Sequence, residues 1–262
     1  MEERDAGGES PVIEHFDRLS VTGAWSRLYE VADGLSYHAH VRRRRVLELL
    51  PDRLGHVIDV GCGPGVMVEA VLDRGGTFHG IDLSQAMVDE GRERYGHLPG
   101  VTFAVGDIEA LDIPDDACDQ VICMGVIEYL KTADRALREM ARILRPGGVA
   151  IITVPKRQHI DLVAVAALAP VRAAARRAGL PGSDQLPRLR LQPSELNAAA
   201  AAVGLVPDGG AQYNFTPLPY PFTRVAPNVA MRVNLPFERW YDADDSVRSF
   251  FGHGFVGRYR KP

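Results

Sequence analysis

Short apolar runs alternate with amphipathic segments through the middle of the chain, from about residue 56 to residue 154. The runs have the composition and length of buried strands, and the segments between them have the apolar spacing of helices. Strand and helix in strict succession predict a parallel sheet with right-handed crossovers. The expected strands are His56–Val60, Thr77–Ile81, Val101–Val105, Asp119–Met124 and Val149–Val154. The expected helices are Pro64–Arg74, Ser84–Tyr95 with Ser84 as its N-cap, and Thr132–Leu144, stopped by Arg145-Pro146-Gly147-Gly148.

Further elements stand on both sides of this core. Three helices are expected before it, at Val12–Leu19, Ala24–Ala32 and Val41–Leu50. After Pro155 the strict alternation stops. The pattern there predicts an Ala-rich helical stretch, a better-defined helix and two more strands, at Ile160–Ala178, Pro193–Val203, Val206–Phe215 and Phe255–Arg260. Thr216–Phe251 is rich in proline and aromatic residues and long for a plain loop, so we expect it to be functional or to carry small elements.

Composition narrows the classes of protein. Of the 262 residues 46% are hydrophobic, enough for a sizeable core, and the net charge of -4 gives no basic field for nucleic acid or an anionic membrane. The three cysteines, Cys62, Cys118 and Cys123, have neither CxxC spacing nor a histidine cluster, which disfavours a zinc site and a disulfide framework. Together with an N-terminus unlike a signal peptide, this predicts a cytoplasmic protein. The longest apolar run, Leu162–Val171, is too short to span a bilayer.

The sequence VIDVGCGPGV, residues 57–66, leads from an expected strand into a turn with three glycines at alternate positions. Glycines permit a tight turn and let the backbone approach a ligand closely. The usual ligand of such a turn is a dinucleotide pyrophosphate at the helix N-terminus. Here the third glycine of the pattern G-x-G-x-x-G/A is missing, because Val66 follows Gly65. The turn alone is therefore a weak signal.

The next three strands also end in residues that suit a ligand. HGIDLS places Asp82 where a carboxylate can reach the ribose hydroxyls of an adenosine. Asp107 follows the third strand, where a polar side chain can hydrogen-bond an adenine amine, and MGVIEY, residues 124–129, follows the fourth. Ligands of open α/β sheets bind at the carboxyl ends of the strands. The four strand ends together predict a nucleoside-type site.

In combination these segments resemble the class I S-adenosylmethionine-dependent methyltransferases, over about Leu47–Pro155. VIDVGCGPG is similar to their glycine motif, GIDLS to their acidic loop, and LRPGG to the turn before their fifth strand. The residues from AVGDIEALDIP to CMGVIEYL are similar to their third and fourth strands with the connecting loop. The resemblance implies that S-adenosylmethionine is the cofactor and S-adenosylhomocysteine the product. It also explains the missing glycine, because this cofactor has no pyrophosphate.

The resemblance also implies roles for individual residues. The glycines would contact the methionine and ribose parts, Asp82 the ribose, Asp107 and Ile108 the adenine, and the backbone of 124–126 the amino group, while Asp59 would orient the loop. The full set of expected cofactor-binding residues is Asp59, Gly61, Cys62, Gly63, Gly65, Asp82, Leu83, Met87, Gly106, Asp107, Ile108, Met124, Gly125, Val126 and Tyr129. We interpret the side chain of Cys62 as a small apolar filler, not as a nucleophile. The basic run Arg42–Arg45 could pair with the cofactor carboxylate, but we interpret most of it as a solvated helix face.

Catalytic residues are harder to identify, because a sulfonium methyl is already activated and the protein mainly aligns the acceptor. A base is needed only where the acceptor loses a proton, and the candidates are His159 and His38. The lead-in HFDRLSVTGAWSRLYE resembles that of ubiquinone-pathway and magnesium-protoporphyrin methyltransferases. Candidate lid or substrate residues are Trp25, Tyr29, Tyr37, Tyr213, Tyr220 and Phe222. The ubiquinone-pathway enzymes have Glu-His where this chain has Glu128-Tyr129, so we predict no metal.

The sequence thus predicts an α/β protein with a Rossmann-like, seven-stranded mixed sheet and helices on both faces. Its expected parts are a disordered tail at 1–10, an N-terminal helical lid at 11–50, and a methyltransferase domain at 51–262 with covering insertions at about 156–191 and 216–251. The first insertion could touch a lipid surface weakly, although a roof over the site is the simpler interpretation. The expected reaction is O-methylation of a ring-containing or apolar small molecule, not of nucleic acid. N- or C-methylation and a non-catalytic cofactor-binding protein are the alternatives, and the oligomeric state is left open.

Overall fold

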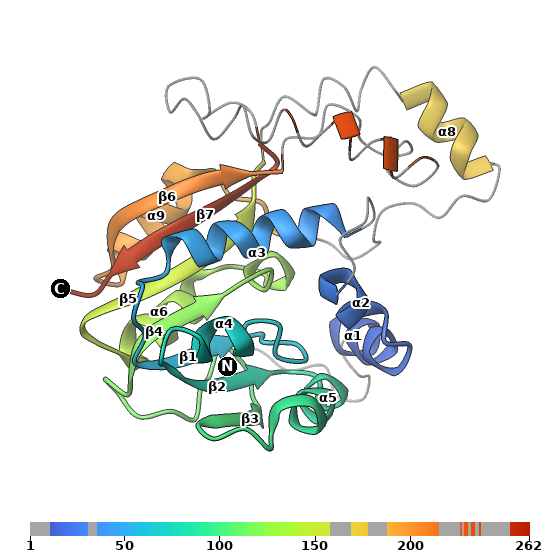
Figure 1. Cartoon of the computed structure of the whole chain (residues 1–262). Helices are drawn as coiled ribbons and strands as arrows, with labels where there is room; N and C mark the ends of the chain where they lie inside the picture. Colours follow the sequence, from blue (N-terminus) through green and yellow to red (C-terminus); the bar gives the residue numbers. More distant parts are fainter. Residues whose placement is uncertain are drawn as a thin grey trace.

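The computed structural model describes residues 11–30, 36–157, 169–177, 188–214, 226, 228–229, 232–233, 236 and 252–262. Its centre is a seven-stranded sheet in the order β3-β2-β1-β4-β5-β7-β6 (Figure 1). Neighbouring strands from β3 to β5 are parallel, and β7 is antiparallel to both β5 and β6. The strands are β1 His56–Val60, β2 Thr77–Asp82, β3 Val101–Val105, β4 Cys118–Cys123, β5 Leu144–Pro155, β6 Val206–Tyr213 and β7 Gly254–Arg260. The predicted Rossmann-like mixed sheet is confirmed.

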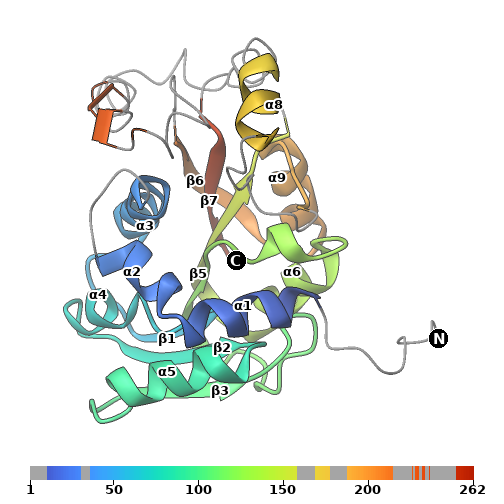
Figure 2. The ribbon, with the colours of Figure 1, turned by 90° about the vertical axis from the view of Figure 1, so that its right-hand side faces the viewer.

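Helices cover both faces of the sheet, as Figure 2 shows. On one face α3 (Tyr37–Leu49), α4 (Val68–Leu72) and α5 (Gln85–Tyr95) bury an apolar cluster that includes Val46, Val71 and Val88. On the other face α6 (Asp134–Ile143) and α9 (Pro193–Ala202) bury a second cluster that includes Leu137 and Leu196. The sheet therefore lies between two apolar layers, which fixes the strand ends in place. The remaining helical elements are α1 Pro11–Val21, α2 Ala24–Glu30, the short 3₁₀ helix η1 Ile127–Tyr129, and α8 Ala169–Arg177.

Three boundaries correct the sequence predictions. The helix expected at Pro64–Arg74 begins only at Val68, because Gly63 and Gly65 have φ of +53° and +84°, which an α-helix cannot contain. The helix expected from Val41 begins at Tyr37. The segment 145–148 ends α6 but is not a separate turn, since β5 starts at Leu144, which pairs with Cys118. The expectations for the tail and for most of Ile160–Ala178 and Thr216–Phe251 lie outside the described residues.

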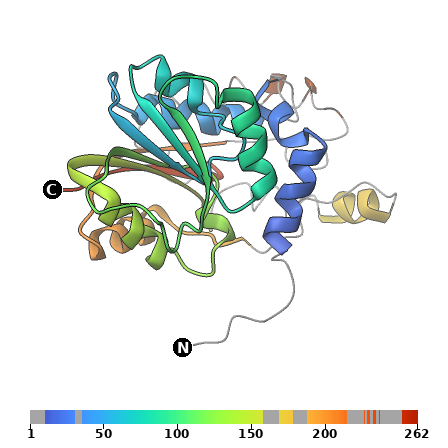
Figure 3. The ribbon, with the colours of Figure 1, turned by 90° about the horizontal axis from the view of Figure 1, so that it is seen from below.

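The first two helices lie at the carboxyl end of the parallel strands (Figure 1), and Figure 3 shows α1 beside α5. The hydroxyls of Ser20 and Ser26 both donate to the carboxylate of Glu90 on α5, Ser20 at 2.8 Å. Ser84, the N-cap of α5, donates its hydroxyl to Asp17. These polar contacts hold α1 and α2 against the edge of the sheet where the candidate site lies.

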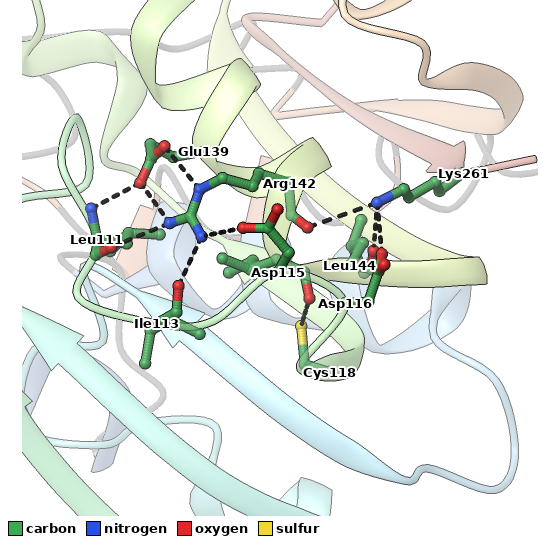
Figure 4. Close-up of polar contacts among 10 residues, drawn as sticks. Leu111, Ile113, Asp115, Asp116, Cys118, Glu139, Arg142, Leu144 and Lys261 are labelled. Carbon is green, nitrogen blue, oxygen red and sulfur yellow. Dashed lines mark hydrogen bonds and ion pairs between the residues drawn. The ribbon is translucent and has the colours of Figure 1, made fainter.

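A connection without a helix, residues 106–117, joins β3 to β4 and is held by Arg142 of α6 (Figure 4). The guanidinium donates to the carbonyl oxygens of Ile113 at 2.6 Å and Leu111 at 3.0 Å. It also pairs with the carboxylates of Asp115 and Glu139, at 2.8 and 2.7 Å. The side chain of Arg142 thus holds this connection in place without a helix, and the connection includes Asp107 and Ile108.

Candidate active site

The glycine turn is bound to the end of the neighbouring strand. The amides of Gly61 and Cys62 donate to the carbonyl of Ile81, at 2.7 and 3.1 Å, and Gly61, Gly63 and Gly65 all have positive φ. An ideal Cβ on Gly61 would lie 2.1 Å from Val126, so a side chain there would collide with the loop after β4. Glycine is therefore required both for the backbone conformation and for the close approach of the two loops. The turn brings the ends of β1, β2 and β4 together.

Asp82 stands at the end of β2 and organises the glycine turn. Its Oδ2 accepts from the amide of Gly63 at 2.8 Å, and its Oδ1 accepts from the amide of Ser84 at 2.9 Å. Burial raises the pKa of Asp82, the backbone amides oppose this, and the nearby Asp17 carboxylate raises it further. Each carboxylate oxygen still has a lone pair for a ligand hydroxyl. Asp82 is therefore placed to bind a ribose and to hold the turn at once.

Asp59, the fourth residue of β1, is 2% exposed. Burial raises its pKa to about 8, and the negative charge of Asp82 adds to the effect. Asp59 in β1 and Asp82 at the end of β2 are thus two neighbouring carboxyl groups with raised pKa values. Carboxyls whose pKa values are perturbed in this way are candidates for a functional site, and a cationic ligand would favour their charged forms.

Arg42 of α3 reaches the end of β4. Its Nη2 donates to the Tyr29 hydroxyl at 2.9 Å, and an ideal Cβ on Gly125 would lie 2.5 Å from its Nη1. Its Nε is buried and has no hydrogen-bond partner among the described residues. Burial lowers the pKa of Arg42, but Tyr29, Tyr213 and Glu128 raise it above its ordinary value, so the guanidinium stays charged. A buried cation with a free donor is a site for an anion.

Aromatic side chains from α1 and α2 cover this edge. Phe16 packs edge-on against Trp25 and Tyr129, with ring centroids 5.4 and 5.2 Å apart, and Trp25 lies 6.0 Å from Tyr29. An ideal Cβ on Gly63 would lie 2.9 Å from the indole nitrogen of Trp25. Trp25 therefore lies against the glycine turn, and Tyr29 belongs to the same aromatic cluster; their role as lid residues stays a prediction.

A strap at 188–191 crosses the ends of β4 and β5. Leu189 donates its amide to the carbonyl of Glu128 at 2.7 Å, and Leu191 donates to the carbonyl of Pro155 at 3.1 Å. Arg188 pairs with the buried carboxylate of Glu128 at 3.3 Å and lies 5.5 Å above the ring of Tyr129. The strap, which is the end of the first expected insertion (156–191), is thus bonded to the loop after β4.

The other predicted site residues fall into four groups. Asp107, Ile108 and Gly106 begin the β3–β4 loop, where Ile108 is buried and Asp107 is exposed. Cys62 packs against Gly80 and Met87 is buried in the core, so both support the site from behind, while Leu83 is exposed. Tyr37 is buried in the core below α3, and His38 is half-buried beside it. His159, Tyr220 and Phe222 lie outside the described residues.

Sequence reasoning missed three residues that contact the candidate site: Asp17, Thr153 and Arg188. Asp17 lies in a lead-in that carried a resemblance but no role, and Arg188 lies in a stretch without periodicity. Thr153 accepts from the amide of Gly125 at 2.8 Å, although its sequence signal is only that of a buried strand. Their roles follow from contacts across the fold, for which the local sequence carries no signal.

The described residues contain no cluster of three or more His, Cys, Asp or Glu side chains that could hold a metal ion. Within the same ranges, no helix is both long and apolar enough to cross a membrane.

The fold and the strand-end site define a Rossmann-like protein with a candidate ligand site at the carboxyl edge of its sheet. Residues 58–152 match a family model described as a methyltransferase domain. A "Probable S-adenosylmethionine-dependent methyltransferase" of Mycolicibacterium smegmatis is 34% identical over 116 residues, which is 42% of this chain and 44% of that protein. The ubiquinone biosynthesis O-methyltransferase of Coxiella burnetii is 30% identical over 94 residues, or 36% of this chain and 40% of the enzyme. The chain thus matches less than half the length of these relatives.

Solved structures share the fold over almost the whole chain. A methyltransferase crystallised with the Haloferax volcanii Trm112 activator has a TM-score of 0.64 at 23% identity, covering 94% of this chain and 97% of that one. A Thermotoga maritima methyltransferase, titled a possible histamine N-methyltransferase, has a TM-score of 0.59 at 18% identity, covering 95% and 99%. The match over residues 58–152 and the similarity to a probable S-adenosylmethionine-dependent methyltransferase support that family for this part of the chain.

The chemistry of the site fits the cofactor of that family. S-adenosylmethionine carries ribose hydroxyls, a carboxylate and two positive charges. Asp82 supplies an acceptor for the hydroxyls, the free Nε of Arg42 supplies a donor for the carboxylate, and the buried acids favour the cationic groups. The unpartnered Nε is the most direct sign of fit, because a buried guanidinium nitrogen left unpaired is costly.

Proposed function

We propose that the chain transfers the methyl group of S-adenosylmethionine to a hydroxyl of a small, ring-containing or apolar acceptor. The observation that carries the proposal is the contact between Asp82 and the amide of Gly63, at 2.8 Å. Through this contact, the carboxylate that would bind the ribose and the glycine turn that would approach the cofactor lie together at the carboxyl edge of the sheet. This is the edge where ligands of such sheets bind.

Each residue at this edge would bind a different part of the cofactor. Asp82 would bind the ribose, and the turn from Gly61 to Gly65 would pack against the ribose and methionine parts. The loop 106–108 would border the adenine. Arg42 would pair with the carboxylate beside Gly125, and Asp59 would hold the turn from below. Leu83, Met87 and Tyr129 complete the proposed set as packing residues.

The cofactor supplies an activated methyl on a sulfonium, whose S–C bond breaks as the O–C bond to the acceptor forms. The task of the protein is then to orient the acceptor behind the methyl and to exclude water. The Phe16, Trp25, Tyr29 and Tyr129 cluster covers the edge and serves that purpose. A reacting hydroxyl must also lose its proton, and His38 and His159 are the proposed acceptors of that proton.

The nature of the acceptor is supported by two features. The net charge of -4 provides no basic surface of the kind that phosphate contacts require. The similarity to a ubiquinone biosynthesis O-methyltransferase favours oxygen over nitrogen or carbon as the methylated atom. The lid residues Trp25 and Tyr29, with Tyr213, Tyr220 and Phe222, would supply the surface for a ring.

The test uses S-adenosylmethionine labelled in the methyl group, incubated with the protein and a small-molecule extract split into organic and aqueous fractions. Label in an organic-soluble product, lost with Asp82→Ala, is the expected result. Gln85→Ala, an exposed residue at the start of α5, is the matched control and keeps full transfer. Binding of S-adenosylhomocysteine without transfer to either fraction would make the chain a binding protein, and absence of binding would refute the proposal.

A further inference from the structure

Asn214, the residue after β6, combines three unfavourable features. It is 5% exposed, its backbone has a φ of +60°, and its Oδ1 is buried with no hydrogen-bond partner among the described residues. Its Nδ2 makes one long contact of 3.5 Å with the carbonyl of His38. That contact fixes the orientation of the amide, because the carbonyl of His38 can only accept and must face the NH₂ group.

The comparison with Asp116 shows that the backbone alone does not explain Asn214. These are the two non-glycine residues with positive φ in the described part of the chain, at +54° and +60°. Asp116 is exposed, and its carboxylate pairs with Lys261 at 2.7 Å, so its turn has an ordinary structural role. Asn214 instead keeps an acceptor atom buried and unpaired. A buried polar atom without a partner, on a strained backbone, calls for a ligand as its explanation.

The position of Asn214 relates it to the acceptor side of the site. Tyr213, its neighbour, lies close enough to Arg42 and Glu128 for their charges to act on it. His38, which Asn214 contacts, is one helical turn before Arg42 on α3. β6 runs parallel to β5, so Asn214 stands at the same carboxyl edge as the candidate site. Its Nδ2 faces the backbone carbonyl of His38, a proposed proton acceptor, and its Oδ1 is the atom left without a partner among the described residues.

We propose that Asn214 is a specificity-determining residue, whose Oδ1 accepts a hydrogen bond from a second O–H or N–H group of the methyl acceptor, next to the reacting atom. This rests on the proposed function. The reacting hydroxyl itself is a poor partner, because an amide oxygen is too weak a base to take the proton that must leave. A second O–H or N–H group next to the reacting hydroxyl keeps its proton, so it can stay hydrogen-bonded to Oδ1 during the whole reaction. Acceptors that lack it leave Oδ1 unpaired, and the site discriminates against them.

The test compares phenol with catechol and with 2-aminophenol, which add a neighbouring O–H or N–H donor. In the wild-type protein, kcat/KM for at least one of the two exceeds that for phenol by about 10- to 100-fold. Asn214→Gly deletes the amide and suits the left-handed backbone, so we expect it to lose this preference. Asp116→Gly is the matched control for a positive-φ residue and keeps the preference.

Binding of S-adenosylhomocysteine, measured by calorimetry, separates this proposal from the proposed function. If Asn214→Gly binds S-adenosylhomocysteine with unchanged affinity but loses the preference for acceptors with a second donor, the proposed role is supported. The comparison of catechol with 2-aminophenol then shows whether that donor is oxygen or nitrogen. An unchanged preference, with or without a lower unfolding temperature, overturns it and makes Asn214 a structural residue. A wild-type protein that binds S-adenosylhomocysteine but methylates none of the three probes also counts against it. A protein that binds no S-adenosylhomocysteine refutes the proposed function itself.

Discussion

The hydroxyl of Ser84 donates to the carboxylate of Asp17, which ties the first helix of the chain to a residue two places after Asp82. Ser84 also caps α5 by accepting from the amide of Met87 at 3.1 Å. The proposed ribose-binding carboxylate, the start of α5 and the covering helices are therefore parts of one connected group. The helices that cover the candidate site are thus held by a residue next to the proposed cofactor-binding carboxylate.

Replacement of Asp17 should loosen this lid. In Asp17→Ala the link to Ser84 is lost, and we expect S-adenosylhomocysteine to bind about tenfold more weakly, the value of one hydrogen bond to a charged group. Backbone amides of α1 should exchange hydrogen faster, while those of β1 should be unaffected. Glu14→Ala, an exposed acid on the same helix, is the control. Equal exchange rates in the two variants would show that Asp17 does not hold the lid.

The proposed roles of Arg42 and Asp82 in cofactor binding should be distinguishable with two different ligands. Arg42→Met removes the donor proposed for the amino-acid end of the cofactor, so S-adenosylhomocysteine should bind about 10- to 100-fold more weakly. 5′-Methylthioadenosine lacks that end and should bind this variant as it binds the wild type. Asp82→Asn should weaken both ligands, because both contain the ribose. Calorimetry with the two ligands decides the matter, and an equal loss of both in Arg42→Met would contradict the assignment.

The strand core and the acidic and glycine parts of the site could be predicted from the sequence, because their signals are local. Apolar runs mark β1 to β4, and Gly61 and Asp82 lie in short motifs at strand ends. The contacts of Asp17 and Arg188 could not be predicted in this way. Asp17 is 67 positions from Ser84, and Arg188 lies after a break in the strand–helix rhythm. Pairings of this kind depend on how the helices pack, which the local pattern does not encode.

The glycine turn shows the same limit at shorter range. The pattern predicts a helix from Pro64, since the residues up to Arg74 have helical spacing. The structure delays α4 to Val68, because Gly63 and Gly65 have left-handed φ values, which an α-helix cannot contain. A local preference yields here to the geometry of the site, as is common where a structure serves a function.

Asp59 should make the stability of the ligand-free protein depend on pH. Its pKa is raised to about 8 by burial, so folding takes up a proton between the ordinary pKa of a free carboxyl and pH 8. The contribution is fully present at low pH and is lost as pH rises through 8. We therefore expect denaturant unfolding to show a smaller free energy at pH 8 than at pH 5. Asp59→Asn should reduce this difference, and an unchanged difference would mean that another group causes it.

Arg142 should stabilise the β3–β4 connection and give it an opposite pH dependence. Arg142→Met leaves the carbonyls of Leu111 and Ile113 without their donor, and we expect a loss of about 1–3 kcal/mol in the free energy of unfolding. The hydrogen bond from Arg142 lowers the pKa of Glu139, so this contribution is present above the ordinary carboxyl range and is lost as pH falls through the lowered value. The acid limb of the stability curve should therefore flatten in Arg142→Met. Arg138→Met, on the same helix and exposed, is the control, and equal acid limbs in the two variants would contradict the role of Arg142.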